Sequence, residues 1–71
     1  MNTATIIMNA LSEGPLGYVG LFKVVDDSLF AGMGGGEVDD VIEDALDMLI
    51  GNGVVVVGGS EVPFGRLYIL A

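Results

Sequence analysis

The sequence predicts an α+β fold in which one amphipathic α-helix packs on one face of a small antiparallel β-sheet, in the order β-β-α-β-β. Residues 37–50 repeat apolar side chains at helical spacing, whereas residues 18–25 and 54–57 are rich in β-branched and aromatic residues. Turns that contain glycine or proline separate these segments. A chain of 71 residues without an internal repeat or a long linker is expected to form one domain over residues 1–71.

The N-terminal third of the chain is predicted to form two strands. Residues 3–11, TATIIMNAL, partly alternate between apolar and polar side chains, as a half-buried strand does. Gly14 and Pro15 then mark a turn, and residues 18–25, YVGLFKVV, have the composition of a second strand. The polar residues 26–28 would turn the chain into a short further segment at 29–33.

Residues 37–50 are predicted to form the helix. Their apolar side chains follow the i, i+3, i+4, i+7 pattern and cover an arc of roughly 160° at 100° per residue. Glycine suits the left-handed position after a helix, so Gly51 and Gly53 are expected to end it. The apolar positions are Val38, Val41, Ile42, Ala45, Leu46, Met48 and Leu49.

Two more strands are predicted after the helix. Residues 54–57, VVVV, are apolar on both faces, which is typical of a central or covered strand. Residues 58–65 would form a loop before a last strand at 66–70. A single helix leaves the second sheet face open, and this face would expose Val19, Leu21 and Val25 unless the N-terminal segment covers it. Such a face favours an alternative function, a non-enzymatic assembly module that oligomerises through it.

The charge of the chain restricts its partners. Ten Asp and Glu residues stand against Lys23 and Arg66, so the formal net charge is −8. Direct binding to nucleic acid or to an anionic membrane requires a basic surface, so neither is expected. No apolar run reaches the roughly 20 residues that cross a bilayer, and no signal peptide is recognisable at the start, which favours the cytoplasm.

The residue types available argue against an enzyme on chemical grounds, and no cofactor is expected. The chain has no histidine and no cysteine, so the commonest general base and the strongest nucleophile are missing. The glycine-rich stretch at 32–37 could point N–H groups at an anion, but Glu37 and Asp39 would occupy the place of the phosphate. Carboxylates along a helix diverge and do not converge on one ion, so no dedicated metal site is expected.

Six of the ten acidic residues lie on the predicted helix, which contains no lysine, arginine or histidine. Asp39, Glu43 and Asp47 form one row at i, i+4 and i+8, and Asp40 and Asp44 form a second row. Their like-charge pairs destabilise the helix by roughly 1–3 kcal/mol. The helix dipole favours the acids of the first turn but not those near the C-terminus. Solubility explains part of this pattern, but it does not explain why lysine is missing.

Two rows of carboxylates on a rigid helix approximate the run of phosphates in DNA, which has one charge per about 1.7 Å of axis. The sequence therefore predicts a nucleic-acid mimic whose partner is a basic nucleic-acid-binding protein, with the chain itself a monomer or weak homodimer. Whether Glu13 and Glu61 join the surface stays open. The expected partner-binding residues are Glu37, Asp39, Asp40, Glu43, Asp44, Asp47, Asp26 and Asp27.

In its small size, its acidity and its segment EVDDVIEDALD at 37–47, the chain resembles the phage-encoded anti-CRISPR proteins. It is most similar in character to those directed at type I systems, with type I-C as the candidate subtype. The resemblance covers the whole chain but contains no diagnostic motif, so it transfers no residue role. It implies inhibition by occupying a basic DNA-binding surface of a CRISPR surveillance (Cascade) complex, inside the host bacterial cell.

Overall fold

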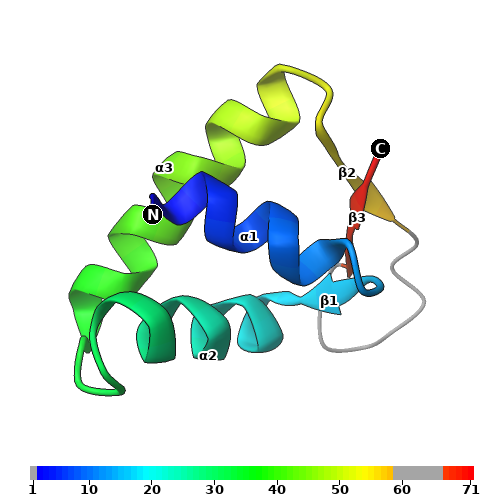
Figure 1. Cartoon of the computed structure of the whole chain (residues 1–71). Coiled ribbons are helices and arrows are strands. Elements are labelled where there is room, and N and C mark those ends of the chain that lie inside the picture. Colours follow the sequence, from blue (N-terminus) through cyan, green and yellow to red (C-terminus); the bar gives the residue numbers. More distant parts are fainter. Residues whose placement is uncertain (1, 59–66) are drawn as a thin grey trace.

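The computed structural model of the chain describes residues 2–58 and 67–71. These ranges form three helices and a three-stranded antiparallel sheet (Figure 1). The fold is α+β, but the predicted order β-β-α-β-β with a single helix is wrong. The elements in chain order are α1 (Thr3–Leu11), β1 (Leu16–Gly17), α2 (Tyr18–Leu29), α3 (Gly36–Gly51), β2 (Val55–Gly58) and β3 (Leu67–Leu70).

The first predicted strand is the helix α1. Asn2 caps this helix, because its side-chain oxygen accepts a hydrogen bond of 2.8 Å from the N–H of Thr5. The buried residues Ala4, Ile7 and Leu11 repeat at i, i+3 and i+7, which is helical spacing. Residues 3–11 thus contain two patterns, a partial alternation that predicts a strand and a helical spacing of apolar residues. The Asn2 cap favours the helix.

The second predicted strand is the helix α2, which continues to Leu29, the first residue of the predicted segment at 29–33. Tyr18, Leu21, Phe22 and Val25 form an i, i+3, i+4, i+7 stripe that packs against the core. This packing overrides the β propensity of the segment. Leu21 and Val25 are fully buried, so the predicted open sheet face that exposes them does not exist, whereas Val19 is 82% exposed on the outer side of α2.

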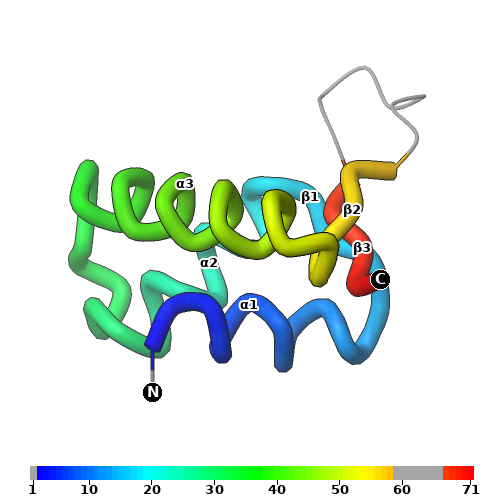
Figure 2. Tube along the Cα trace, turned by 90° about the horizontal axis from the view of Figure 1, so that it is seen from above, coloured from blue at the N-terminus to red at the C-terminus, as the bar shows by residue number. Residues whose placement is uncertain are grey.

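The three helices pack against one another in pairs and enclose a single hydrophobic core (Figures 1 and 2). Seen from above, α1 and α3 run along opposite sides of the molecule (Figure 2), and α2 runs below α1 in the view of Figure 1. The sheet closes one end of this group, beside the C-terminal end of α3 (Figure 1). The largest fully buried side chains are Ile7, Leu21, Val25, Val38, Ile42 and Val55.

A tight corner joins α2 to α3. The carboxylate of Asp26 accepts a hydrogen bond of 2.9 Å from the N–H of Gly34. A side chain cannot be placed at Gly34, because a Cβ atom there would lie 2.3 Å from Val38 Cγ2 and 2.6 Å from Phe30 Cγ. Gly35 has φ +59° and precedes the first turn of α3. Glycine at these two positions therefore allows α3 to start directly after the corner.

In the sheet, β3 lies between β1 and β2, and both pairs are antiparallel. The predicted strands at 54–57 and 66–70 correspond to β2 and β3, but β2 is an edge strand. Val56 and Val57 are 45% and 42% exposed, so the prediction of a strand covered on both faces is wrong. Arg66 and the predicted loop after Gly58 lie outside the described residues.

The element order is α-β-α-α-β-β, and the sheet order is β1-β3-β2. Among residues 2–58 and 67–71, no helix combines the length and apolar character needed to cross a membrane.

Candidate functional site

The candidate site is the outer surface of α3, which we call the acidic face and define as Glu37, Asp39, Asp40, Glu43, Asp44 and Asp47. All six side chains are exposed. The buried side of the same helix carries Val38, Ile42, Ala45, Leu46 and Leu49. At 100° per residue the six acids fall within an arc of roughly 160° opposite the core, with Ile50 between two of them. The predicted helix and its division into an apolar and an acidic side are therefore present in the structure.

The acidic face is long and has one sign of charge. From Glu37 to Asp47 it extends about 15 Å along the axis at 1.5 Å per residue. No lysine or arginine belongs to α3, so none of its acids has a basic partner on the same helix. Glu37 and Asp39 lie in the first turn, where the helix dipole favours negative charge. Asp44 and Asp47 lie too far along the helix to gain from it.

One acid of this face has a partner on a neighbouring helix. The Tyr18 hydroxyl, at the start of α2, donates a hydrogen bond of 2.5 Å to Asp39 Oδ1. The pKa of Tyr18 is raised well above its ordinary value, mainly because burial disfavours the phenolate. The hydrogen bond to Asp39 and the negative charges of Asp39 and Glu43 raise it further. Tyr18 therefore stays a neutral donor at physiological pH and holds Asp39 in place.

A hollow of about 510 Å³ opens beside the acidic face, where α2, α3 and β3 meet. We call it the tyrosine pocket. Two aromatic rings line it from different elements, Tyr18 from α2 and Tyr68 from β3. Its other lining residues all belong to α3, and three of them are acids of the acidic face: Glu43, Asp44, Leu46, Asp47 and Ile50.

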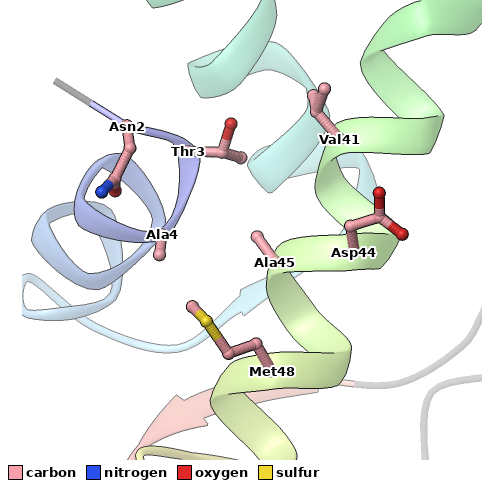
Figure 3. A pocket seen from close by; sticks show the side chains of 7 residues that line it. All are labelled: Asn2, Thr3, Ala4, Val41, Asp44, Ala45 and Met48. Atoms are coloured by element: carbon pink, nitrogen blue, oxygen red, sulfur yellow. The ribbon is translucent and has the colours of Figure 1, made fainter.

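A second hollow, of about 360 Å³, lies between the start of α1 and the middle of α3 (Figure 3). Ala45 and Met48 project from α3 toward Ala4 of α1, whereas the Asp44 carboxylate extends on the other side of α3 (Figure 3). Its lining is mostly apolar, and its reactive groups are the hydroxyl of Thr3 and the carboxylate of Asp44. This hollow offers van der Waals contact but no site for acid–base chemistry.

Asp26 and Asp27, which were expected to extend the acidic surface, lie on α2 at its junction with the corner. Asp26 has a structural role, because its carboxylate binds the N–H of Gly34. Asp27 is exposed close to the same corner. Both are therefore near the N-terminal end of α3 and not within its two rows. Glu13 lines a separate hollow with residues of α1 and α2, and Glu61 lies outside the described residues.

Two chemical alternatives find little support in the geometry. The glycine-rich stretch at 32–37 uses the N–H of Gly34 to bind the Asp26 carboxylate, so this donor is not directed at an external anion. Within the part of the chain that the structure describes, no group of three or more His, Cys, Asp or Glu side chains is arranged to hold a metal ion.

Reasoning from sequence did not identify Tyr18, Tyr68 or Ile50 as neighbours of the acidic residues. Ile50 falls between Asp39 and Glu43 on a helical wheel at 100° per residue, so its position was readable. The two tyrosines were not, because both were assigned to strands whose pairing the sequence does not specify. In the structure Leu16 pairs with Tyr68, and this contact brings the start of α2 beside β3.

Comparisons of the chain with models of protein families, with curated proteins and with solved structures gave no match. The functional assignment therefore depends on the surface chemistry of the chain and on its topology.

Proposed function

We propose that this protein is a non-enzymatic inhibitor that uses the acidic face as a nucleic-acid mimic and binds a basic DNA-binding surface of another protein. The observation that carries the proposal is the arc of six exposed carboxylates on a helix without a basic residue. A groove that evolved to hold phosphates attracts such a surface, because long-range electrostatic attraction depends on charge and not on the chemical group.

The stability of the helix supports this interpretation. Three i,i+4 and three i,i+3 pairs of like charge destabilise α3 by roughly 1–3 kcal/mol. A domain of this length has a total stability of about 4–10 kcal/mol, so the repulsion is a substantial cost. Lysine at Asp44 or Asp47 would relieve it and would also complement the helix dipole. Retaining acids at these positions is explained if the charge is needed for binding.

The position of the acidic face in the fold also supports a mimic. Two successive helices such as α2 and α3 also occur in helix-turn-helix proteins, where the second helix faces DNA, whereas the exposed surface of α3 repels DNA. Fold alone does not imply function, so this topology does not make the chain a DNA-binding protein. The same scaffold presents α3 outward as a rigid rod, which suits insertion into a groove of a protein.

The resemblance to small acidic anti-CRISPR proteins names the candidate target. In this proposal the acidic face occupies the surface of a type I CRISPR surveillance complex that binds target DNA, and it blocks that binding. The protein would then act in the cytoplasm of a bacterial cell. Type I-C is the first subtype to test.

The experiment measures binding of a labelled target duplex to a purified type I-C surveillance complex in the presence of increasing amounts of the protein. We expect the protein to displace the duplex, with an apparent affinity that falls steeply as salt rises. Two outcomes would contradict the proposal. The complex could release the duplex although the protein does not bind the complex, or it could keep the duplex fully bound while the protein is also bound.

Matched variants separate the acidic face from net charge. Glu43→Lys with Asp47→Lys and Glu13→Lys with Asp27→Lys change the net charge equally, but only the first pair alters the rows of α3. We expect the first variant to lose inhibition by at least about tenfold, since loss of close charge pairs costs about 1.4 kcal/mol or more. The second should retain most of it. Equal losses would show that net charge alone is responsible.

A further inference from the structure

The tyrosine pocket differs from the rest of the acidic face in that two tyrosine rings and two apolar side chains belong to its otherwise polar wall. Leu46 is buried and Ile50 is 37% exposed, so Ile50 supplies most of the aliphatic surface of the pocket. Tyr18 and Tyr68 add two aromatic rings from outside α3. Solubility requires none of these groups at a hollow of the surface.

Pairing between β1 and β3 builds this arrangement. Leu16 pairs with Tyr68 and Gly17 pairs with Leu67, so Tyr18, the next residue in the chain, starts α2 beside β3. The hydrogen bond from Tyr18 to Asp39 then ties the first residue of α2 to α3. One wall of the pocket is therefore fixed before any ligand binds, and a fixed site loses little entropy on binding.

We propose that the tyrosine pocket receives an arginine side chain of the basic partner, an assignment that rests on the proposed function. A planar guanidinium stacks on aromatic faces and is attracted by their π-electrons. The same group forms bidentate hydrogen bonds with carboxylates, and Glu43, Asp44 and Asp47 line the same hollow. Stacking and carboxylate binding are thus available together at one place on the surface.

Lysine fits this pocket less well than arginine. Its ammonium group is a compact point charge that cannot form the bidentate pair of hydrogen bonds that a guanidinium forms with a carboxylate. It also lacks the planar surface that stacks on a tyrosine ring. The acidic face alone does not distinguish the two residues strongly, because long-range attraction depends on charge. A preference for arginine over lysine is therefore the signature of the pocket.

The experiment compares hexa-arginine and hexa-lysine peptides of equal charge by isothermal titration calorimetry at one ionic strength. We expect the protein to prefer hexa-arginine by roughly three- to tenfold. Tyr68→Leu removes one of the two rings and should reduce the preference, whereas Tyr68→Phe should keep it because the ring remains. Asp40 lies outside the pocket, so Asp40→Lys should weaken the binding of both peptides and leave the ratio of their affinities unchanged.

The outcomes distinguish this inference from the proposed function. Equal binding of both peptides, or a preference that is undiminished in Tyr68→Leu, would overturn the pocket while leaving the acidic face as the partner surface. Failure of both peptides to bind at low salt would contradict the proposed function itself. Should Tyr68→Leu fail to fold, NMR of the unchanged protein decides: hexa-arginine, but not hexa-lysine, should shift the ring protons of Tyr18 and Tyr68.

Discussion

The hydroxyl of Tyr18 donates a 2.5 Å hydrogen bond to Oδ1 of Asp39 and so connects the first residue of α2 to the first turn of α3. This contact joins the hydrophobic framework to the acidic face. It spans 21 residues in sequence, and it places an aromatic ring at the edge of the charged surface. The protein therefore holds one of its acids in a defined position, and all six acids of the face are exposed.

Removing this hydroxyl tests how much the connection stabilises the fold. Tyr18→Phe keeps the ring but loses the hydrogen bond, so we expect the free energy of unfolding to fall by about 0.5–1.5 kcal/mol. Urea unfolding followed by circular dichroism measures the change. Asp39→Asn keeps an oxygen acceptor and should cost less than Asp39→Ala. If the losses of unfolding free energy in Tyr18→Phe and Asp39→Ala add up to the loss in the double variant, the two residues are not coupled.

The raised pKa of Tyr18 predicts a loss of stability in alkali. A tyrosine of the unfolded chain loses its proton near its ordinary pKa of about 10, whereas Tyr18 in the folded protein keeps it to higher pH. The folded state then binds more protons than the unfolded state, so the stability from this group is complete below about pH 10 and falls as pH rises above it. Unfolding free energies measured across this range should decline less in Tyr18→Phe. An equal decline in both proteins would refute the assignment to Tyr18.

The corner between α2 and α3 predicts opposite effects for two neighbouring glycines. A Cβ atom at Gly34 would overlap Val38 and Phe30, so Gly34→Ala should destabilise the protein by about 1–3 kcal/mol. A Cβ atom at Gly36 would meet nothing within 4 Å, and this residue starts the helix. Gly36→Ala should therefore stabilise it by about 0.5–1 kcal/mol. Thermal unfolding of the two variants checks the sign of each effect.

The charge pattern of α3 predicts that stability and binding respond in opposite directions. Asp47→Lys removes two like-charge pairs, gives Glu43 a basic partner at i+4 and complements the helix C-terminus. We expect it to raise the free energy of unfolding by roughly 0.5–1.5 kcal/mol while weakening binding to a basic partner. Asp40→Lys is the control, since a cation near the N-terminus opposes the dipole and should gain less. If Asp47→Lys and Asp40→Lys raise the free energy of unfolding equally, and the increase persists in high salt, this electrostatic explanation is excluded.

The sequence predicted α3 well because its pattern is long. The predicted range, 37–50, contains nearly four helical turns, and over that length the 3.6-residue repeat is hard to confuse with alternation. The observed helix, Gly36–Gly51, differs from the predicted range by one residue at each end. The composition of its outer side, and hence the acidic face, follows directly from that repeat.

Shorter segments misled the same reasoning. Residues 3–11 and 18–25 contain β-branched residues and partial alternation. Both segments also contain apolar residues at helical spacing, and several of these residues are buried. Over eight or nine residues the two patterns fit almost equally well. The choice between them depended on which apolar surface was available to pack against, and that surface consists of the other two helices.

The sequence by itself determined the charge of this protein and the acidic helix, and with them the prediction that nucleic acid is not a direct partner, because each depends on composition or on a local repeat. The tertiary structure decided that α1 and α2 are helices, that Asp26 belongs to the corner, and that Tyr18 and Tyr68 line one pocket. The physical reason is the distance along the chain between the residues that make contact. Burial of α1 and α2 and pairing of β1 with β3 are contacts between distant parts of the chain, and no local pattern of side chains encodes which of these contacts forms.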